Sequence, residues 1–343
     1  MSVTIKDVAK EVGVSISTVS RVVTDDSRIS QPTKDKVREA MAHLGYHPNA
    51  IARSLVRQRS NTIALAMSRA PKFAMAIPFY PEIISGISEY AMAEHYHLML
   101  VSSESREEEC AQTLQLLRHR RADGVIHLAS RIKDPLIEAL LQESFPFVVI
   151  GRVPGVEVPC VNNDNLAAAA MAVTHLLDEG YTRVACVGGS PDLVVTCDRR
   201  DGYRRALAAR GIPVREDWNQ IVCHESTAEA GYNAGLELLS APDRPEAVFA
   251  LDDTLAAGVL NSARKLGISV PRELGIVGFN DEPLSSLIEP ALTTVKIHIF
   301  EMGQRAARML IDLINGVCTT RSVVVPAEMV IRQSSRRSVR PGE

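Results

Sequence analysis

The sequence predicts an α/β protein with a small helical head and a larger core of two lobes, each lobe a parallel sheet with helices on both faces. Three observations support this prediction. Residues 1–45 contain short amphipathic helices that end at glycines, and residues 61–279 alternate between apolar strands and amphipathic helices, in two successive series. A chain of 343 residues is also too long for one ordinary core.

The head begins with two helices joined by a glycine-containing turn. Thr4 is a suitable N-cap for the first helix, with the acidic Asp7 three positions further on. Gly13 supplies the backbone freedom that a tight turn needs, and Ser15 can cap the second helix. Apolar residues at helical spacing form the inner faces of the two helices: Val8, Ala9, Val12, Val14, Val19 and Val22.

The outward face of the second helix is small and polar, apart from one isoleucine. It consists of Ile16, Ser17, Ser20 and Arg21. Small side chains let a helix approach base edges closely, hydroxyl groups bond to bases or phosphates, and an arginine can donate two hydrogen bonds to guanine. The pattern predicts a helix-turn-helix that reads DNA, with Arg21 as the main candidate for base contact. A plain helical hairpin with solvated serines is the alternative.

A third helix completes the head, and a shorter helix follows it. The third helix starts after Ser30 and places Val37, Met41 and Leu44 on one face, and residues 45–49 then break it. Pro48 can open a short helix over residues 49–56. Because isolated helices shorter than about 12 residues are marginal in water, we expect this segment to form only against DNA or a second copy of the chain.

The core alternates between strand and helix patterns. Buried strands are predicted at residues 61–67, 97–102, 124–128, 147–151, 183–188, 247–251 and 274–279, with helices at 80–93, 107–118, 135–143, 199–210 and 255–266. An amphipathic helix over residues 301–315 and a strand over 322–326 follow. Two open parallel sheets imply a cleft between two lobes, and ligands bind such sheets beyond the carboxyl ends of their strands.

Polar residues gather at those strand ends. They occur at residues 150–152, 162–165, 198–200, 251–253 and 278–281. Carboxylates, amides and guanidinium groups that face one cleft suit the hydroxyl groups of a sugar, which both donate and accept hydrogen bonds. Helix capping is the alternative for Asp164, Asp253 and Asp281. It does not explain Arg199, because an arginine at a helix start gains nothing from the helix dipole.

Two motifs carry a resemblance to a known family. V-x-x-S-x-S-T-V-S-R-V over residues 12–22 and G-Y-x-P-N-x-x-A-R-S-L over residues 45–55 resemble the lactose-repressor and galactose-repressor (LacI/GalR) family of bacterial transcription regulators. The resemblance implies a helix-turn-helix head on a two-lobed core like that of periplasmic binding proteins. In that family the second helix enters the major groove, and short helices paired from two subunits enter the minor groove, where a leucine wedges between base pairs.

The resemblance also assigns the DNA-binding residues and the expected partners. Ser15, Ile16, Ser17 and Arg21 would face the operator with Ser20 on the same face, Thr4, Thr18 and Tyr46 would meet phosphates, Asn49, Ala52 and Arg53 would lie at the minor groove, and Leu55 would be the wedge. The operator is expected to be a palindrome read by a homodimer.

The same resemblance divides the chain into domains. It implies a helix-turn-helix domain over residues 1–46, a hinge helix and linker over 47–60, and an effector-binding and dimerisation core over 61–338. Residues 290–295 resemble the family's P-L-T-T-V segment, so each lobe is expected to be discontinuous: the first over about 61–160 and 292–321, the second over about 161–291 and 322–338. The implied effector contacts are Arg199, Asp252 and Asn280. Arg152 is a weaker addition, and Phe79 could stack on a sugar ring or simply pack in the core.

The loop after the first core strand departs from the common family pattern. Residues 67–80 form a longer loop than the D-x-x-N-P-F-F-like turn of many members and lack its asparagine. Together with V-V-I-G-R and N-N-D-N they resemble the maltose-operon regulators. They predict a repressor that maltose or a malto-oligosaccharide releases from its operator. A purine or nucleoside that acts as a corepressor is the alternative.

Charge and cysteine content agree with a cytoplasmic DNA-binding protein. Residues 1–60 hold ten Lys and Arg against six Asp and Glu, whereas the whole chain has a net charge of −3, so the head is positive and the body negative. This division suits phosphate binding by the head alone. The six cysteines have no paired spacing, which favours reduced thiols. No apolar run reaches the ~18 residues of a membrane span, and helix signals rather than a secretory leader open the chain.

An enzyme and a free sugar-binding transport module are the rival classes. The sequence at Gly188-Gly189-Ser190 is neither a nucleophile elbow nor a dinucleotide loop, and no phosphate-binding loop occurs. His43 and His47 have the helical spacing of metal ligands, but the intervening glycine interrupts that helix. We therefore expect no catalytic residues, no cofactor and no metal, and the DNA-binding head opposes the transport module.

Overall fold

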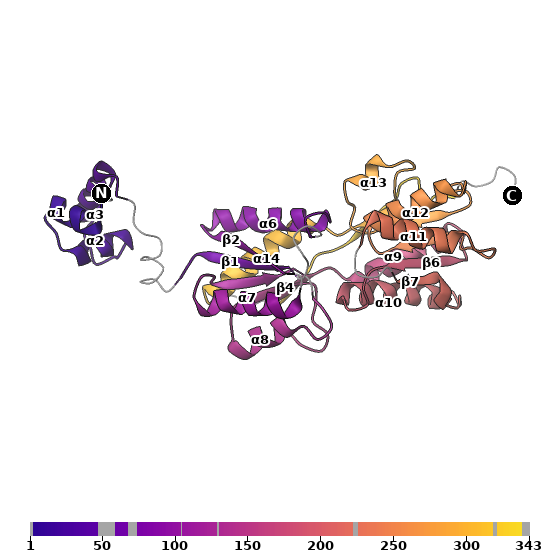
Figure 1. Ribbon diagram of the computed structural model, residues 1–343, viewed down its shortest axis with the longest axis horizontal. Helices are drawn as coiled ribbons and strands as arrows, with labels where there is room; N and C mark the ends of the chain where they lie inside the picture. Colours follow the sequence, from indigo (N-terminus) through magenta and orange to yellow (C-terminus); the bar gives the residue numbers. More distant parts are fainter. Residues whose placement is uncertain are drawn as a thin grey trace.

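The computed structural model describes residues 3–46, 59–67, 74–103, 105–128, 130–221, 226–317 and 321–337. Figure 1 shows a helical head and two α/β lobes, and the predicted fold class is confirmed. The predicted hinge helix over residues 49–56 lies outside the described residues. Where the structure describes the chain, no helix is long and apolar enough to cross a membrane.

Three helices make up the head: α1 (Ile5–Val12), α2 (Ile16–Val23) and α3 (Gln31–Leu44). They share one small core in which Val8 and Val19 are fully buried. The predicted cap of α1 is confirmed, because the Asp7 carboxylate accepts hydrogen bonds from the backbone N–H (2.8 Å) and the hydroxyl group (2.7 Å) of Thr4. Gly13 ends α1 with a φ of 72°, a left-handed conformation that glycine adopts at little cost.

The first lobe contains a six-stranded parallel sheet in the order β11-β5-β4-β3-β1-β2. The strands are β1 (Thr62–Met67), β2 (His97–Ser102), β3 (Gly124–His127), β4 (Phe147–Ile150), β5 (Cys160–Asn162) and β11 (Ser322–Val324). Helices α6 (Phe79–Ala93) and α14 (Ile299–Ile314) pack together on one face, and α7 (Arg106–Arg118) and α8 (Pro135–Glu143) on the other (Figure 1). The central strands are therefore buried on both faces, as their continuous apolar sequences predict.

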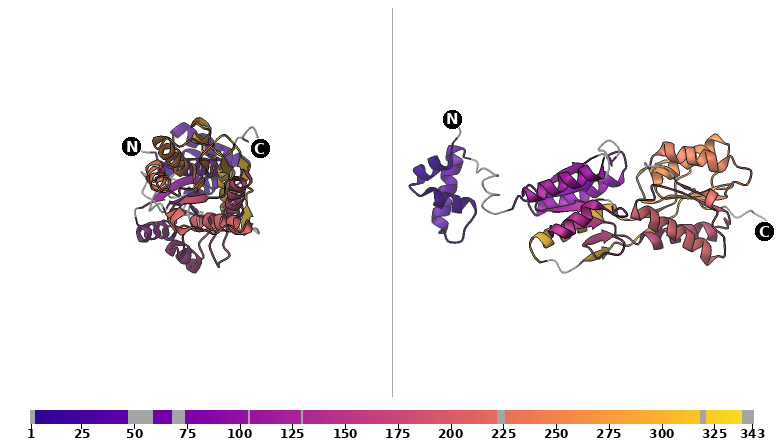
Figure 2. Two further views of the ribbon diagram at one scale, coloured as in Figure 1. Left: turned by 90° about the vertical axis from the view of Figure 1, so that its right-hand side faces the viewer. Right: turned by 60° about the horizontal axis from the view of Figure 1, so that its bottom comes forward.

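The second lobe contains a four-stranded parallel sheet in the order β7-β6-β8-β9. Its strands are β6 (Val184–Gly188), β7 (Asn219–Ile221), β8 (Ala247–Ala250) and β9 (Gly275–Val277). Helices α9 (Asn165–Asp178) and α10 (Val194–Ala209) pack together below the sheet as Figure 2 (right) draws it, and α11 (Ala228–Leu239) and α12 (Asp253–Lys265) above it. The short helices η1 (Glu216–Trp218) and α13 (Leu284–Leu287) lie in connecting segments.

Three segments connect the two lobes. One runs from β5 into α9, and the other two form the antiparallel ribbon of β10 (Thr294–Lys296) and β12 (Glu328–Val330). Assignment of the strand at residues 322–326 to the second lobe is wrong, because β11 pairs with β5 and places Ser322 opposite Cys160. The strand thus extends the first lobe's sheet beyond β5 and becomes its edge strand.

Helix α10 begins earlier than its sequence predicts. It starts at Val194 rather than at Arg199, so Arg199 lies in its second turn. Valine has a low helix propensity, but Val194 is only 2% exposed and its burial outweighs that preference. The argument that Arg199 stands at a helix start therefore does not apply, and its role has to be judged from its contacts.

Candidate DNA-binding and effector sites

The N-terminus of α2 carries a chain of hydroxyl groups. The Ser15 hydroxyl accepts a hydrogen bond from the backbone N–H of Thr18 (3.1 Å), which confirms the predicted cap. The same hydroxyl lies 2.7 Å from that of Ser17 and 2.8 Å from that of Thr18. Because a helix N-terminus carries partial positive charge, these groups form a polar surface that favours an anion such as a phosphate.

The predicted outward face of α2 is the exposed one. Ser15, Ser17 and Arg21 are exposed and Ile16 is 45% exposed, while Val19 and Val22 are buried. Other candidate DNA-binding residues are less accessible or already use their polar groups within the head. Thr18 and Ser20 are half-buried, Thr4 uses its hydroxyl to cap α1, and the half-buried Tyr46 packs against the core of the head.

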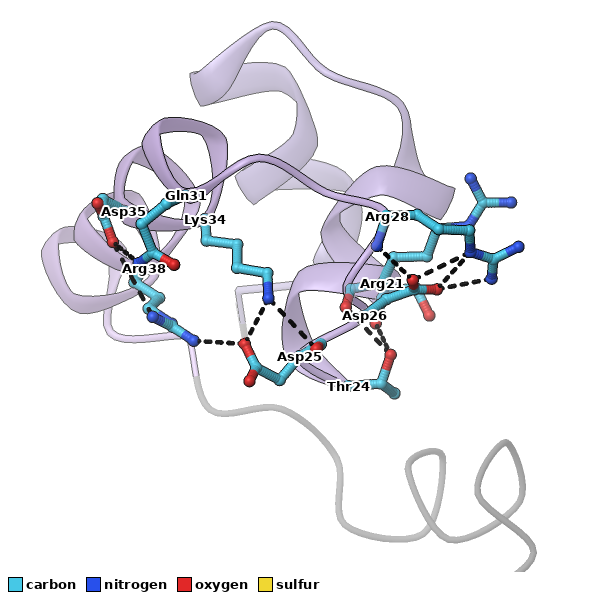
Figure 3. Close-up of polar contacts among 10 residues, drawn as sticks. Arg21, Thr24, Asp25, Asp26, Arg28, Gln31, Lys34, Asp35 and Arg38 are labelled. Atoms are coloured by element: carbon cyan, nitrogen blue, oxygen red, sulfur yellow. Dashed lines mark hydrogen bonds and ion pairs between the residues drawn. The ribbon is translucent and has the colours of Figure 1, made fainter.

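Ion pairs fix the loop that follows α2 (Figure 3). The Asp25 carboxylate accepts from Lys34 and Arg38 of α3, both at 2.9 Å, and Asp26 pairs with Arg28 at 2.6 Å. The hydrogen bonds from Arg28 hold the pKa of Asp26 far below its usual range. The guanidinium of Arg21 has no hydrogen-bond or ion-pair partner within the described part of the head. The two carboxylates of this loop, Asp25 and Asp26, are thus paired with other cations, and Arg21 is left as a cation that can bind DNA.

The minor-groove candidates Asn49, Ala52, Arg53 and Leu55 lie outside the described residues. Their roles stay predictions.

A cavity of about 150 Å³ lies between the lobes, where the predicted cleft should be. Both lobes contribute to it, and it opens at the carboxyl ends of the parallel strands. Of the predicted effector residues, the cavity is lined by Phe79, Arg199, Asp252 and Asn280. Its other polar lining residues are Ser130, Asn162, Asn163, Asn165, Thr196 and Ser226, and its apolar ones include Tyr80, Leu128, Ile150, Leu193, Leu251, Ile297 and Met302.

Arg199 is the centre of the polar network in this cavity. It is 7% exposed and donates from Nε to Asn165 Oδ1 (2.9 Å), from one terminal nitrogen to the carbonyl of Leu251, and from the other to Asn280 Oδ1 (3.2 Å). Its guanidinium also stacks 3.6 Å from the centre of the Phe279 ring. Burial lowers the pKa of Arg199 to about 10, so the side chain still carries its charge at neutral pH. Residues from four separate segments of the second lobe are thus held together around one cation.

Three carboxylates surround this arginine. Asp252 lines the cavity and caps α12, accepting from the N–H of Leu255 (2.7 Å). Asp253 and Glu282 lie behind it, and burial raises their pKa values to about 7 and about 8. Asp252 thus caps a helix and lines the cavity, and of the residues for which capping was the alternative, Asp164 caps α9 by accepting from the N–H of Ala167 (2.9 Å).

Arg152 does not line the cavity. It forms an ion pair with Asp198 of α10, with Nε 2.8 Å from Oδ2. Because Arg152 follows β4 of the first lobe, this pair joins the two lobes. A second joining contact lies nearby, where Ile132 N–H donates to the carbonyl of Asp192 (2.9 Å) and Val194 N–H donates to that of Ser130 (3.2 Å).

The sequence pattern missed several lining residues. Asn163 and Asn165 stand in a polar segment that the pattern indicated, but no single residue there could be chosen, because Asn162 and Asp164 are equally polar. Ser130, Thr196 and Ser226 carried no signal, since isolated hydroxyl residues occur throughout the chain. Only the fold brings these residues to one cavity.

Comparison with known proteins identifies both parts of the chain. Residues 4–49 match the sequence profile described as bacterial regulatory proteins, lacI family, and residues 173–335 match a periplasmic binding protein-like domain. Catabolite control protein A of Priestia megaterium is 32% identical over 98% of this chain and 100% of its own. MalR of Streptococcus pneumoniae is 35% identical, over 92% of this chain and 94% of its own. CytR of Escherichia coli is 34% identical, over 97% of this chain and 96% of its own.

Two solved structures resemble the whole chain. The complex of the transcriptional regulator CelR with cellobiose is 32% identical, covers 97% of this chain and 99% of its own, and has a TM-score of 0.75. The lac repressor dimer bound to operator and the anti-inducer ONPF is 25% identical, covers 98% and 99%, and has a TM-score of 0.86.

Proposed function

Because this chain belongs to the LacI family of bacterial transcription regulators, we propose that it represses a sugar-utilisation operon and is released from its operator by a sugar bound between its lobes. It is a DNA-binding regulator rather than an enzyme. The observation that carries the proposal is the cavity between the lobes, whose lining combines the guanidinium of Arg199, the carboxylate of Asp252 and the amide of Asn280.

The head would read a palindromic operator as a homodimer in the cytoplasm. Arg21 would contact base edges, together with Ile16, Ser17 and Ser20, because these side chains lie on the free face of α2. The hydroxyl groups at the start of α2 would bind phosphates. The hinge residues around Leu55 would enter the minor groove, as the corresponding residues do in other members of the family. The lac repressor dimer on its operator supports this arrangement.

The lobes would transmit effector binding to the head. The two sets of contacts that join the lobes close one side of the cavity, so a ligand that fills it changes how firmly the lobes hold together. A rotation of the first lobes in a dimer would then separate the hinge segments and raise the free-energy cost of ordering them on DNA. A coupling free energy of ~1 to 3 kcal/mol is enough for a useful switch.

Two features support a sugar as the effector. The cavity combines hydroxyl, amide and carboxylate groups with apolar surface, which suits the polar edges and apolar faces of a pyranose ring. CelR, whose structure holds cellobiose, has the same fold and is 32% identical. Maltose or a malto-oligosaccharide is the specific proposal. A purine or nucleoside corepressor is the second candidate, because the rings of Phe79 and Tyr80 at the cavity could stack on a base.

The test measures operator and effector binding on the same protein. An operator is first selected from a random duplex library, and its affinity is measured by fluorescence anisotropy with and without maltose, maltotriose, cellobiose, adenosine and guanine. We expect a palindromic operator and a loss of affinity with a sugar. Tighter operator binding with a purine alone would favour the corepressor, and no selected palindrome would contradict the proposal.

A further inference from the structure

Asn163 is a buried amide that lacks a hydrogen-bond partner for its nitrogen. It follows β5, lines the cavity and is only 2% exposed. Among the described residues no acceptor lies within hydrogen-bond distance of its Nδ2. Buried polar groups are nearly always paired, so a lining amide of this kind indicates an acceptor that belongs to a ligand.

The hydrogen bonds of Arg199 determine which end of the Asn163 amide is left over. A guanidinium only donates, so the atom of Asn165 that faces Arg199 Nε has to be the oxygen. The nitrogen of Asn165 then points to Asn163, where it lies 3.3 Å from the carbonyl oxygen and 3.5 Å from Oδ1. A reversed Asn163 amide would place two donors against each other. The N–H₂ group of Asn163 is therefore the end left for the cavity.

The charges around the cavity select against an anionic ligand. In the described lining, Arg199 is the single cationic side chain and Asp252 the single carboxylate, so the two formal charges cancel. Asp253 and Glu282 lie directly behind, and Asp198 adds a further carboxylate near Arg199. Three of the five N–H donors of Arg199 are directed at Asn165, Leu251 and Asn280. A phosphate would therefore meet one partly engaged cation whose charge Asp252 already balances, while Asp198 is paired with Arg152.

We propose that Asn163 is a specificity-determining residue that donates a hydrogen bond to an oxygen of an uncharged sugar, and that the cavity excludes sugar phosphates. This inference rests on the proposed function and specifies the ligand more closely. A sugar ring or hydroxyl oxygen can accept from Asn163 while a neighbouring hydroxyl donates to Asp252, which lines the same cavity. The phosphate of a nucleotide or a phosphorylated sugar would be repelled by the Asp252 carboxylate and could not take up this arrangement.

The test compares Asn163→Leu with Asn165→Leu, two buried asparagines with opposite hydrogen-bond status. Leucine has the branched shape of asparagine but is larger and has no polar atoms, so both variants add the same volume, while Asn163→Leu removes an unpaired donor and Asn165→Leu removes a paired amide. We expect the thermal midpoint without ligand to fall less in Asn163→Leu than in Asn165→Leu. Calorimetry should show the sugar that binds the native protein to bind Asn163→Leu at least ~10-fold more weakly, the effect of one lost hydrogen bond.

A shape-preserving variant and a charged probe complete the test. Asn163→Asp keeps the size of the side chain but loses the N–H donors, and its affinity for the sugar should fall further as the pH rises and the carboxyl group ionises. Glucose 6-phosphate and maltose 6-phosphate should not bind the native protein at concentrations that saturate it with glucose or maltose.

The outcomes separate the two proposals. Equal sugar affinity of the native protein and Asn163→Leu, or a thermal midpoint that falls as far in Asn163→Leu as in Asn165→Leu, would overturn the role of Asn163 and leave the sugar effector standing. Tighter binding of the phosphorylated sugars would overturn the exclusion of anions. If no sugar binds the native protein, the proposed effector is wrong and this inference is wrong with it.

Discussion

Replacement of Glu282 by glutamine should stabilise the second lobe above neutral pH. Glu282 is 2% exposed; its Oε1 accepts from Asn280 Nδ2 (3.2 Å) and its Oε2 from the hydroxyl of Thr254 (3.0 Å). A glutamine can keep both contacts, because its oxygen accepts from Asn280 and its N–H₂ donates to the Thr254 hydroxyl. Glu282→Gln therefore imitates the protonated acid and removes only the buried charge.

The size and sign of the effect follow from the pKa of Glu282. Burial and the nearby Asp252 and Asp253 raise this pKa to about 8, from the value of 4.5 for an unperturbed glutamate. The folded lobe thus keeps a proton that the unfolded chain releases, so its stability falls as the pH rises from about 4.5 to about 8. Each pKa unit corresponds to ~1.4 kcal/mol, which gives an upper value of about 5 kcal/mol, and relaxation around the charge lowers it to about 2 to 5 kcal/mol.

Urea unfolding followed by tryptophan fluorescence measures this lobe selectively. Trp218 is the single tryptophan of the chain and is buried in the second lobe. Between pH 5.5 and 8.5 the native protein should lose stability, Glu282→Gln should lose less, and the exposed Glu229→Gln should follow the native protein. Asp253, whose pKa is raised to about 7, accounts for the slope that remains. A native stability that is constant or rises over this range, with no gain in Glu282→Gln, would refute the reasoning.

Three further variants test the separation of the two sites. Arg199→Ala should abolish effector binding in calorimetry and leave operator affinity without effector intact, because it removes the cation that orders the cavity; loss of operator binding as well would contradict separate sites. Leu55→Ala should do the reverse, weakening operator binding at least ~10-fold in anisotropy with an unchanged effector dissociation constant. Arg152→Ala should weaken effector binding by roughly 5-fold, the scale of a half-exposed ion pair, and should lower the unfolding midpoint, because it leaves the buried Asp198 carboxylate without this partner. An unchanged effector affinity in that variant would show that the Arg152–Asp198 pair does not stabilise lobe closure.

The helices of the head and most strands of the core could be predicted because local patterns determine them. The strand over residues 97–102 and the helix over residues 135–143 have the predicted bounds. A run of apolar residues and a proline at a helix start are local patterns that determine where these elements begin and end. Helices α9 and α11 were not assigned: α9 is alanine-rich, and α11 contains two glycines. Gly231 and Gly235 are needed because α11 and α12 approach so closely that a Cβ at Gly231 would lie 2.3 Å from the carbonyl oxygen of Leu255. The need for glycine thus comes from the contact between two helices, and it leaves no helical periodicity in the sequence of α11 itself.

The candidate site was predicted in part, for a similar reason. Arg199, Asp252 and Asn280 each follow a recognisable motif, and the structure brings all three to one cavity. Arg152 carries an equally polar motif but pairs with Asp198 of the other lobe, a contact that depends on how the lobes meet and so leaves no local pattern. The role proposed for Asn163 depends on the absence of a partner, which no sequence pattern records.

Helix α14 gives the proposed switch a physical connection. Met302, near its start, lines the cavity, and at its other end Arg59 donates to the carbonyl of Ile314 (2.9 Å) and to Asn315 Oδ1 (2.7 Å). The helix has 16 residues and so spans about 24 Å. It packs closely on α6, since a Cβ at Gly86 would lie 2.1 Å from the carbonyl oxygen of Phe300. We expect a ligand that shifts the cavity end of α14 to move α6 with it, and Arg59, which stands where the chain leaves the hinge and linker, to move as well.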